Sequence, residues 1–248
     1  MFKYYTADYE GEMLIEETSW KDRKKRENKA WLSKTIVNEE HNGIAHIIGN
    51  GPSRKNFDLG LLHGQKGGEG GVQPIGQTYG CNLLFVDFTP TFLICYNKFL
   101  CAEIAESKYC NDNIVYTNQR QITNHPEHFH LYPHFKPNNA GTLAAWLACA
   151  DGHKEVYLLG FDFYETGKEN IYYKQRPCYD FAAEAEDSNA KWTKGLVNLM
   201  KMYNDVRFYR VVQHKKTIMP NELLWLDNFK QITYLEYVNR CSIGAIAR

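Results

Sequence analysis

A largely apolar run of five residues leads directly into a glycine-rich turn, and this junction constrains the fold more than any other feature. The run spans Ile44 to Ile48, and Gly49-Asn50-Gly51-Pro52-Ser53 follows it. A short apolar run bounded by turn residues is typical of a buried strand in a parallel sheet. Glycine allows a close approach of the backbone, and Pro52 cannot lie inside a central strand. The sequence therefore predicts a strand ending at Ile48 and a turn that begins a helix.

The Gly49–Ser53 turn has two interpretations. A strand that ends in a glycine-rich turn at a helix start is a common place for a phosphate or nucleotide, because the backbone N–H groups attract anions. The same residues also suit an ordinary connection between a strand and a helix. On this pattern alone both interpretations stay open.

Composition narrows the class of protein. The chain has 248 residues and is 44% hydrophobic, which suits one α/β domain or one domain with a lid. Lys and Arg together number 29, as do Asp and Glu, so a nucleic-acid partner is not expected. Seven cysteines without paired spacing indicate reduced thiols. No apolar run approaches the roughly 20 residues of a membrane span, and we expect a cytoplasmic protein without a transmembrane segment.

Strands and helices are expected to alternate after residue 42. The expected strands after the first are 92–96, 114–117, 155–160 and 206–212, the last being the final strand of the main sheet. The expected helices are 98–107, 143–150 and 190–203. This order predicts an α/β fold, a Rossmann-like and mostly parallel sheet flanked by helices. In such sheets ligands bind at the carboxyl ends of the strands.

Three segments are expected along the chain. Residues 1–42 form an N-terminal helical extension, in which the charge run 21–26 belongs to a helix that continues to Val37. We interpret that run as a solvated helix face rather than a contact for a phosphate-rich partner. Residues 43–215 form the nucleotide-sugar-binding domain, including a lid at about 165–189, and residues 216–248 pack on it.

Three asparagines follow strands or turns and are candidates for ligand binding. They are Asn50, Asn82 and Asn97. An amide both donates and accepts hydrogen bonds, so it can bind a ribose, a base edge or a phosphate. Asparagine is also common in turns because it tolerates left-handed backbone geometry. Their recurrence at successive strand ends favours a pocket.

Asp162 and the tyrosines beyond it are candidates for chemistry. Asp162 follows the expected strand 155–160, where a carboxylate can bind a metal, act as a base or accept backbone N–H groups. The structural and catalytic roles are equally open. Tyr164, Tyr172 and Tyr173 come next, and a phenol can hydrogen-bond a leaving phosphate without a metal.

Two other stretches are less specific. The glycine-rich segment beginning at Gly64 is either a cover for a ligand or, as we favour, an insertion within 64–76. His125, His128, His130 and His134 could bind a transition metal, but no established ligand spacing is present. A solvated or pH-sensitive loop is the favoured interpretation, and no metal site is expected.

Four further segments, together with the Gly49–Ser53 turn, occur in an order along the chain that resembles a known family. They are Gly80-Cys81-Asn82, Cys95-Tyr96-Asn97, Ala140-Gly141-Thr142 and the block from Gly152 to Tyr164. With the Gly49–Ser53 turn, they resemble the bacterial α-2,3/α-2,8-sialyltransferases of the Campylobacter lipooligosaccharide type, over roughly residues 44–213. Archaeal hydroxymethylpterin diphosphokinase-like proteins share a similar Gly-x-Gly-Pro-Ser turn and a Gly-x-Asp strand end.

The resemblance implies an inverting transfer from a CMP-activated sugar donor to a glycan or another hydroxyl acceptor. It implies one Rossmann-like domain with a small lid, no obligatory metal or cofactor, and a homo-oligomer. It implies that tyrosines stabilise the leaving phosphate, Tyr164 with either Tyr172 or Tyr173. The residues expected to bind the donor are Asn50, Gly51, Ser53, Asn82, Asn97, Ala140 and Gly141, and we add Asp162 to them.

The chain departs from that family at the general base. The family has a His ahead of the long helix, but no His lies between His153 and His214, and the position falls on Asp187. A carboxylate can take a proton from a sugar hydroxyl, although a pKa of about 4 makes it a weaker base than imidazole. Either Asp187 replaces the base, or the chain binds a nucleotide without turnover. A third alternative is pyrophosphoryl transfer with Mg²⁺, in which Asp162 would be a metal ligand.

Overall fold

The computed structural model describes most of the chain in separate stretches. They are residues 2–3, 13–21, 24–32, 43–63, 75–125, 128–132, 139–163, 171–172 and 186–241. For residues up to 32, and for 119, 123 and 186–191, only the backbone is described. The loop 64–74, most of the expected lid, His134, Tyr164 and Tyr173 lie outside the described residues.

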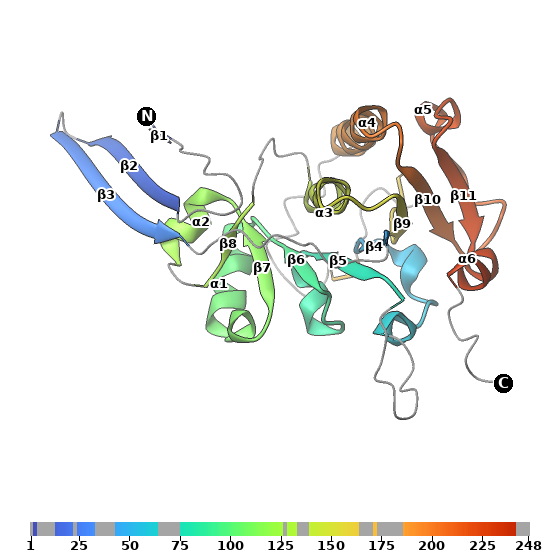
Figure 1. Cartoon of the computed structure of the whole chain (residues 1–248), viewed down its shortest axis with the longest axis horizontal. Helices are drawn as coiled ribbons and strands as arrows, with labels where there is room; N and C mark the ends of the chain where they lie inside the picture. The colour runs from blue at the N-terminus through green and yellow to red at the C-terminus, as the bar shows by residue number, and fades with distance from the viewer. Residues whose placement is uncertain are drawn as a thin grey trace.

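Within the described residues the main sheet has eight parallel strands, which confirms the predicted Rossmann-like α/β fold (Figure 1). Its order is β11-β10-β9-β4-β5-β6-β7-β8. The strands are β4 (Ile44–Ile48), β5 (Gln77–Cys81), β6 (Phe92–Ile94), β7 (Ile114–Thr117), β8 (His130–Leu131), β9 (Glu155–Leu159), β10 (Arg207–Val212) and β11 (Phe229–Thr233). The expectation that β10 ends the sheet was wrong, because β11 pairs with it in parallel.

The strand order reverses between β4 and β9. From β4 the chain adds β5 to β8 outward on one side, then returns to place β9, β10 and β11 on the other. β4 and β9 pair in register from Ile44 opposite Glu155 to Ile48 opposite Leu159. The crevice outside the carboxyl ends of two such strands is where open α/β sheets bind ligands. The fold therefore directs attention to the residues that follow Ile48 and Leu159.

Helices cover both faces of this sheet. On one face lie α3 (Ala140–Ala150), α4 (Glu186–Met202) and α5 (Asn221–Leu224); on the other lie α1 (Lys98–Glu106), α2 (Gln119–Asn124) and α6 (Tyr234–Arg240). Short 3-10 segments η1 (Pro52–Arg54), η2 (Leu59–His63), η3 (Asn82–Val86) and η4 (Tyr109–Asn111) complete the second layer or connect strands. Among the described helices, none is both long and apolar enough to cross a membrane.

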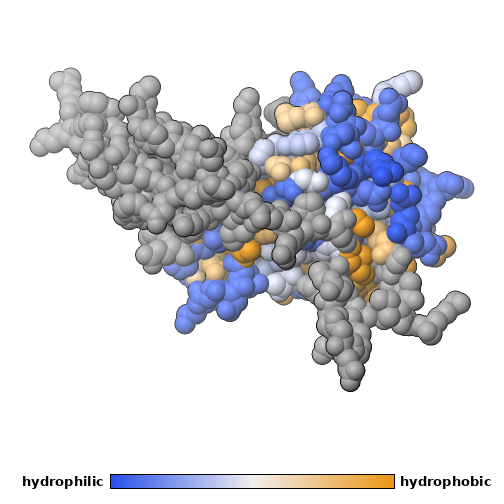
Figure 2. Space-filling model, viewed as in Figure 1, coloured by the Kyte–Doolittle hydropathy of each residue, from blue (hydrophilic) through white to orange (hydrophobic). Residues whose placement is uncertain are grey.

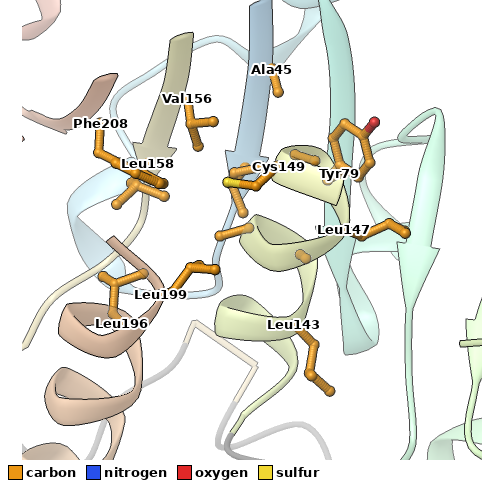
Figure 3. Close-up of a cluster of buried hydrophobic side chains, with 14 of the residues drawn as sticks. Ala45, Tyr79, Leu143, Leu147, Cys149, Val156, Leu158, Leu196, Leu199 and Phe208 are labelled. Atoms are coloured by element: carbon orange, nitrogen blue, oxygen red, sulfur yellow. The ribbon is translucent and has the colours of Figure 1, made fainter. Parts of the chain in front are cut away.

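Side chains of the central strands alternate between two cores. Ala45 and Val156 face the layer of α3 and α4, whose Leu143 and Leu196 belong to the same buried cluster (Figure 3). Tyr157 faces the opposite layer, with α1 and α6. Because helices cover both faces, both sets of side chains are apolar, which explains why these strands are continuous apolar runs rather than alternating ones.

His46 interrupts the apolar run of β4 for a structural reason. It lies opposite Tyr157 in the sheet, and Tyr157 lies opposite Tyr209. The His46 and Tyr157 rings stack, as do the rings of Tyr157 and Tyr209. From α6, the hydroxyl of Tyr237 is hydrogen-bonded to Nδ1 of His46 at 2.7 Å. Burial lowers the pKa of His46 to about 3, so the imidazole is neutral inside this core.

The N-terminal region differs from the prediction. The expected helix was wrong, because β1 (Phe2–Lys3), β2 (Met13–Lys21) and β3 (Lys24–Leu32) form an antiparallel sheet. The charged residues of the run have good helix propensity, but strand pairing overrides it. Two residues separate β2 from β3, which is the length of a tight hairpin, and the register sets Glu16 opposite Lys29.

The described surface is mostly hydrophilic in the view of Figure 2, with separate hydrophobic areas. Among the residues whose side chains the structure describes, the most exposed large apolar one is Trp225, which is 85% exposed and directly follows α5. Leu224 beside it is also exposed. Isolated apolar side chains are normal on a monomer, so the expected homo-oligomer stays a prediction.

Candidate functional site

The Gly49–Ser53 turn packs directly against the end of β9. The N–H of Gly49 donates to the carbonyl of Leu159 at 2.8 Å, and the N–H of Gly51 donates to that of Gly160 at 3.0 Å. A Cβ on Gly51 would lie 2.3 Å from Oδ2 of Asp162 and 2.5 Å from the Gly160 oxygen. Glycine is therefore required at position 51 by the neighbouring segment itself. The close approach does not need a ligand to explain it.

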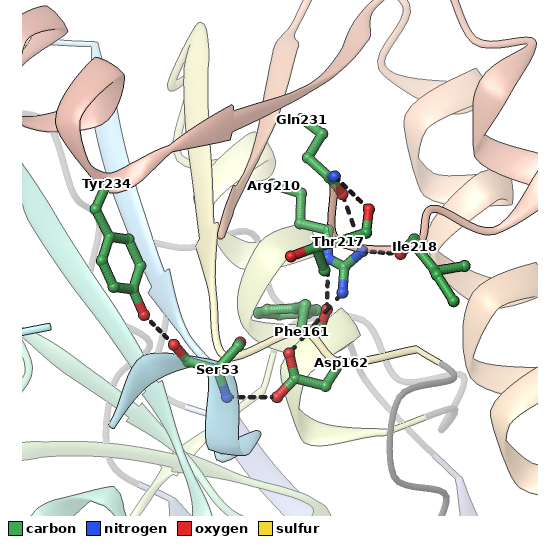
Figure 4. Close-up of polar contacts among 8 residues, drawn as sticks. All are labelled: Ser53, Phe161, Asp162, Arg210, Thr217, Ile218, Gln231 and Tyr234. Atoms are coloured by element: carbon green, nitrogen blue, oxygen red, sulfur yellow. Dashed lines mark hydrogen bonds and ion pairs between the residues drawn. The ribbon is translucent and has the colours of Figure 1, made fainter. Parts of the chain in front are cut away.

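Asp162 holds this turn in place. Its Oδ2 accepts the backbone N–H of Ser53 at 2.8 Å, and its Oδ1 faces Nη2 of Arg210 at 3.9 Å (Figure 4). Both side chains of the ion pair are buried. Of the roles open to Asp162, the structure shows the acceptance of a backbone N–H group. A guanidinium beside the carboxylate also opposes the binding of a divalent cation there.

Arg210 is a central residue of the site that sequence reasoning missed. It comes from β10, and its Nε donates to the Phe161 carbonyl at 2.8 Å (Figure 4). Its Nη1 donates to the Ile218 carbonyl at 2.7 Å and to Oε1 of Gln231 at 3.0 Å. It thus joins the segments that follow β9 and β10 to the middle of β11. The sequence did contain a signal for this residue. An arginine inside the apolar strand 207–212 predicts a buried partner, because arginine is rarely buried unless it is paired.

The ring of Phe161 lies between the turn and the start of α3. A Cβ on Gly49 would lie 3.2 Å from this ring, and so would a Cβ on Gly141. Asn139 caps α3, its Oδ1 accepting the N–H of Thr142 at 2.8 Å. The structure therefore brings Gly141 and its neighbour Ala140, both buried, to the edge of the sheet that carries the turn.

Asn50 links the turn to β5. Its Nδ2 donates to the Cys81 carbonyl at 3.0 Å, and the residue is only 8% exposed. Its Oδ1 is buried and has no hydrogen-bond partner among the described residues, and the same holds for Oγ of Ser53 and Nε of Arg54. Buried polar atoms are nearly always satisfied by protein, water or a ligand. Three such atoms in and beside the Gly49–Ser53 turn make it a candidate site for a polar ligand.

Asn82 and Asn97 lie along the same edge and also perform backbone roles. Asn82 follows β5 and has a φ of 54°, the left-handed geometry that asparagine tolerates. Asn97 follows β6 and caps α1, its Oδ1 accepting the N–H groups of Phe99 and Leu100 at 3.0 and 3.3 Å. The structure brings both residues to the carboxyl edge of the sheet. The left-handed turn explains why position 82 is an asparagine, and the helix cap explains the asparagine at position 97.

Tyr172 is the expected phosphate-stabilising tyrosine that the structure describes. The N–H of Ile171 donates to the Asn50 carbonyl at 2.8 Å, so this short segment crosses the end of β4. The buried hydroxyl of Tyr172 accepts from Nη2 of Arg54 at 2.8 Å and donates to Oδ1 of Asp87. Burial and the Asp87 carboxylate raise the pKa of Tyr172 well above its usual value, which keeps the phenol protonated.

The other chemical candidates are described less fully. Asp187 is the second residue of α4, although its side chain is outside the described part of the structure. Because α4 connects the parallel strands β9 and β10, it runs against them and begins at the carboxyl edge. The backbone of Asp187 therefore lies on the same edge as Asn50. Tyr164 and Tyr173 remain outside the described residues.

The histidines at 125–134 do not form a metal site within the described residues. His125, His128 and His130 are described, and no group of three metal-binding side chains was found in the described parts of the chain. His128 is exposed. The favoured interpretation as a solvated loop stays a prediction, because His134 is not among the described residues.

No model of a protein family matches the chain, and neither a curated protein nor a solved structure matches it. What the site can do therefore has to follow from its geometry and from the residues at the strand ends.

Proposed function

We propose that this chain is a sialyltransferase-like glycosyltransferase, which binds a CMP-activated sugar at the ends of β4 and β9. The observation that carries the proposal is the position of the Gly49–Ser53 turn. It lies against Gly160 and Asp162, where the strand order reverses. Ligands of open α/β sheets bind at this point.

The polar atoms of the turn support a nucleotide in the crevice. Oδ1 of Asn50, Oγ of Ser53 and Nε of Arg54 are buried and have no hydrogen-bond partner in the described part of the chain. The two side-chain oxygens suit the hydroxyl and amino groups of a nucleoside, and the guanidinium suits a phosphate. These residue types can bind a nucleotide with one phosphate without a Walker-type loop.

Helix starts support a phosphate on the same edge. α1 begins at Lys98 behind the cap Asn97, and α3 begins at Ala140 behind the cap Asn139. Both helices follow strands of the parallel sheet, so their positive N-terminal ends face the carboxyl edge. The edge therefore provides positive potential to the donor phosphate, to which Lys98 adds a cation.

The proposed reaction proceeds with inversion. The acceptor oxygen forms a bond to the anomeric carbon, while the bond from that carbon to the phosphate oxygen of CMP breaks. Asp187 accepts the proton of the acceptor hydroxyl, and Tyr164 with Tyr172 or Tyr173 donates hydrogen bonds to the departing phosphate. In this structure the Tyr172 hydroxyl donates to Asp87 instead, so donor binding would have to redirect that bond.

Pyrophosphoryl transfer is a weaker alternative because of the surroundings of Asp162. That reaction needs Mg²⁺ and would use Asp162 as a ligand. One oxygen of Asp162 accepts the Ser53 N–H and the other faces Arg210. A carboxylate with these partners is better suited to holding the turn than to binding a cation.

Thermal unfolding with nucleotides tests the proposal. We expect CMP to raise the melting temperature without added metal, and Asn50→Ala to reduce that shift more than the protein's own melting temperature. Asn56→Ala is the matched control, because Asn56 is exposed and bonds only Gln213 among the described residues. Stabilisation by ATP with Mg²⁺ but not by CMP would contradict the transferase. Binding of CMP without release of CMP from any CMP-sugar would favour a non-catalytic nucleotide-binding protein.

A further inference from the structure

Two cysteine thiols meet at the end of β6. Cys95 directly follows this strand, and Cys101 lies in α1. Their sulfur atoms are 3.7 Å apart, and Sγ of Cys101 lies 3.4 Å from the Cys95 carbonyl oxygen and 3.6 Å from Oγ1 of Thr117. Both cysteines are fully buried. Among the described cysteines, this is the one contact between two thiols.

We propose that Cys95 and Cys101 are a redox-active pair, which hydrogen peroxide converts to a reversible intramolecular disulfide. A disulfide holds its sulfur atoms about 2.05 Å apart, so the two sulfurs have to approach by roughly 1.6 Å. Rotation of the side chains and a small adjustment of one helical turn can supply this movement. The inference does not depend on the proposed function, because it concerns the thiols alone.

Cys101 is the thiol that reacts first. The sulfur of Cys101 contacts the Cys95 sulfur and the Thr117 hydroxyl, and these two contacts lower the pKa of Cys101, although burial opposes them. The same contact and burial raise the pKa of Cys95. Cys101 also lies near the positive N-terminal end of α1, which favours a thiolate. The pair therefore consists of the more acidic thiol, Cys101, and a neighbouring thiol that can resolve the intermediate.

The reaction balances with peroxide as the oxidant. The Cys101 thiolate attacks one peroxide oxygen, the O–O bond breaks, and Cys101 becomes a sulfenic acid while the released hydroxide takes a proton and becomes water. The Cys95 sulfur then attacks the Cys101 sulfur, the S–O bond breaks, and the thiol proton leaves with the oxygen as a second water. Two electrons pass from the thiols to the peroxide.

The chain between the two cysteines gives the oxidant a route. Lys98 and Phe99 are exposed, and Tyr96 and Asn97 are partly buried. The side chain of Asn97 holds this first turn by accepting the N–H groups of Phe99 and Leu100. Local opening of one surface turn costs far less than global unfolding. Peroxide can therefore reach the thiols while the sheet stays folded.

Thiol mapping of the full chain tests the proposal. The reduced protein is treated with hydrogen peroxide, then denatured and alkylated with N-ethylmaleimide before mass spectrometry. We expect two of the seven cysteines to escape alkylation, with a loss of about 2 Da and full recovery after a thiol reductant. Trypsin cleaves after Lys98, so the disulfide should join two peptides, one with Cys95 and one with Cys101.

Variants assign the pair. Cys81 shares a tryptic peptide with Cys95, so Cys81→Ser should keep the disulfide, and so should the matched control Cys149→Ser. Cys95→Ser and Cys101→Ser should each abolish it; the former should leave a sulfenic acid on Cys101 that a dimedone probe traps. If either serine variant fails to fold, the wild-type peptide map still decides. Full alkylation after peroxide, or a disulfide between other cysteines or between chains, would overturn the proposal.

Discussion

The carboxylate of Asp162 accepts the backbone N–H of Ser53 at 2.8 Å across 109 positions of sequence. This bond fixes the glycine-rich turn after β4 to the residues that follow β9. Arg210 lies behind the same carboxylate, and the hydroxyl of Tyr234 donates to the Ser53 carbonyl from the other side. The geometry of the turn therefore depends on three distant parts of the chain, and each contributes one polar side chain.

Replacing Asp162 should destabilise the fold strongly. Asp162→Ala leaves the Ser53 N–H without its acceptor and removes the negative charge beside buried Arg210. Because this change removes one partner of a buried ion pair and leaves the other charge uncompensated, we expect a loss of about 3 kcal/mol in the free energy of unfolding. Urea denaturation measures it. Asp162→Asn should lose less, because its amide oxygen can still accept the N–H.

The control for this change is Asp205→Ala. Asp205 pairs with Lys154 on the surface, and both side chains are more than half exposed. Exposed pairs contribute little, so the unfolding curve should hardly move. An equal loss for Asp205→Ala and Asp162→Ala would show that the buried network has no special role.

A methyl group at Gly51 should disrupt the crevice. In Gly51→Ala, Cβ would lie 2.5 Å from the Gly160 carbonyl oxygen, a backbone atom that cannot rotate away. We expect a loss of about 1–3 kcal/mol, as for other overpacked sites, and weaker CMP binding. Gly60→Ala is the control, because its Cβ would approach only the Asp58 side chain. A neutral Gly51→Ala would mean that the two segments are not this close in solution.

Stability should decrease as the pH falls through the weakly acidic range because of His46. Its pKa is about 3 in the folded state and about 6.5 when unfolded, so the unfolded state binds a proton that the folded state excludes. The stabilisation is complete above about pH 6.5 and decreases toward pH 3, by up to about 1.4 kcal/mol for each pH unit.

His46→Leu tests this effect when its stability is compared with that of the wild type at several pH values. The difference in unfolding free energy between wild type and His46→Leu should shrink as the pH is lowered from about 7 to 5. The control is His214→Leu, which removes an exposed imidazole instead of a buried one. A constant difference between wild type and His46→Leu would show that His46 is already protonated or hydrated in the folded protein.

Substitutions at Asn97 separate its cap from its proposed contact with the donor. Asn97→Ala should cost about 1 kcal/mol, because α1 loses the acceptor for two N–H groups. Asn97→Ser retains a cap but loses the amide. If Asn97 binds the donor, Asn97→Ser should keep the stability of wild type yet weaken CMP binding, which isothermal titration calorimetry measures. Unchanged affinity would assign Asn97 to the cap alone.

Asp187→Asn tests the proposed base. The amide cannot take a proton, so transfer from a CMP-sugar should slow by about 100-fold or more, while the affinity for CMP stays the same. Glu186→Gln is the matched control from the same turn of α4 and should keep its rate. Equal rates in wild type and Asp187→Asn would remove Asp187 from the mechanism and leave the non-catalytic interpretation.

Local patterns predicted the local structure. The apolar runs gave β4, β9 and β10, and the helix expected at 98–107 is α1 (Lys98–Glu106), which starts where Asn97 provides a cap. The ends of these elements are marked by local signals, a Gly or an Asn beside an apolar run, so they can be predicted without knowing the tertiary structure.

Non-local pairing accounts for what the sequence did not reveal. β8 has two residues and β11 lies in a segment with no clear apolar run, so each is a strand only because a neighbour pairs with it. The partner of Asp162 also depends on the strand order, which brings Ser53 and Arg210 beside it. Residue type alone could not decide between its structural and catalytic roles.

The stacked rings of His46, Tyr157 and Tyr209, which α6 covers, have a consequence for the order in which the chain folds. His46 in β4 is hydrogen-bonded to Tyr237, 191 positions later, and the second edge of β4 stays unpaired until β9 has been synthesised. The first strand of the main sheet is thus completed by the last helix of the described chain. During synthesis, β4 and β5 would emerge with an open edge and an unpaired imidazole, the state most exposed to aggregation. A chaperone that binds the nascent chain should therefore increase the yield of folded protein, while the free energy of unfolding of the finished fold stays the same.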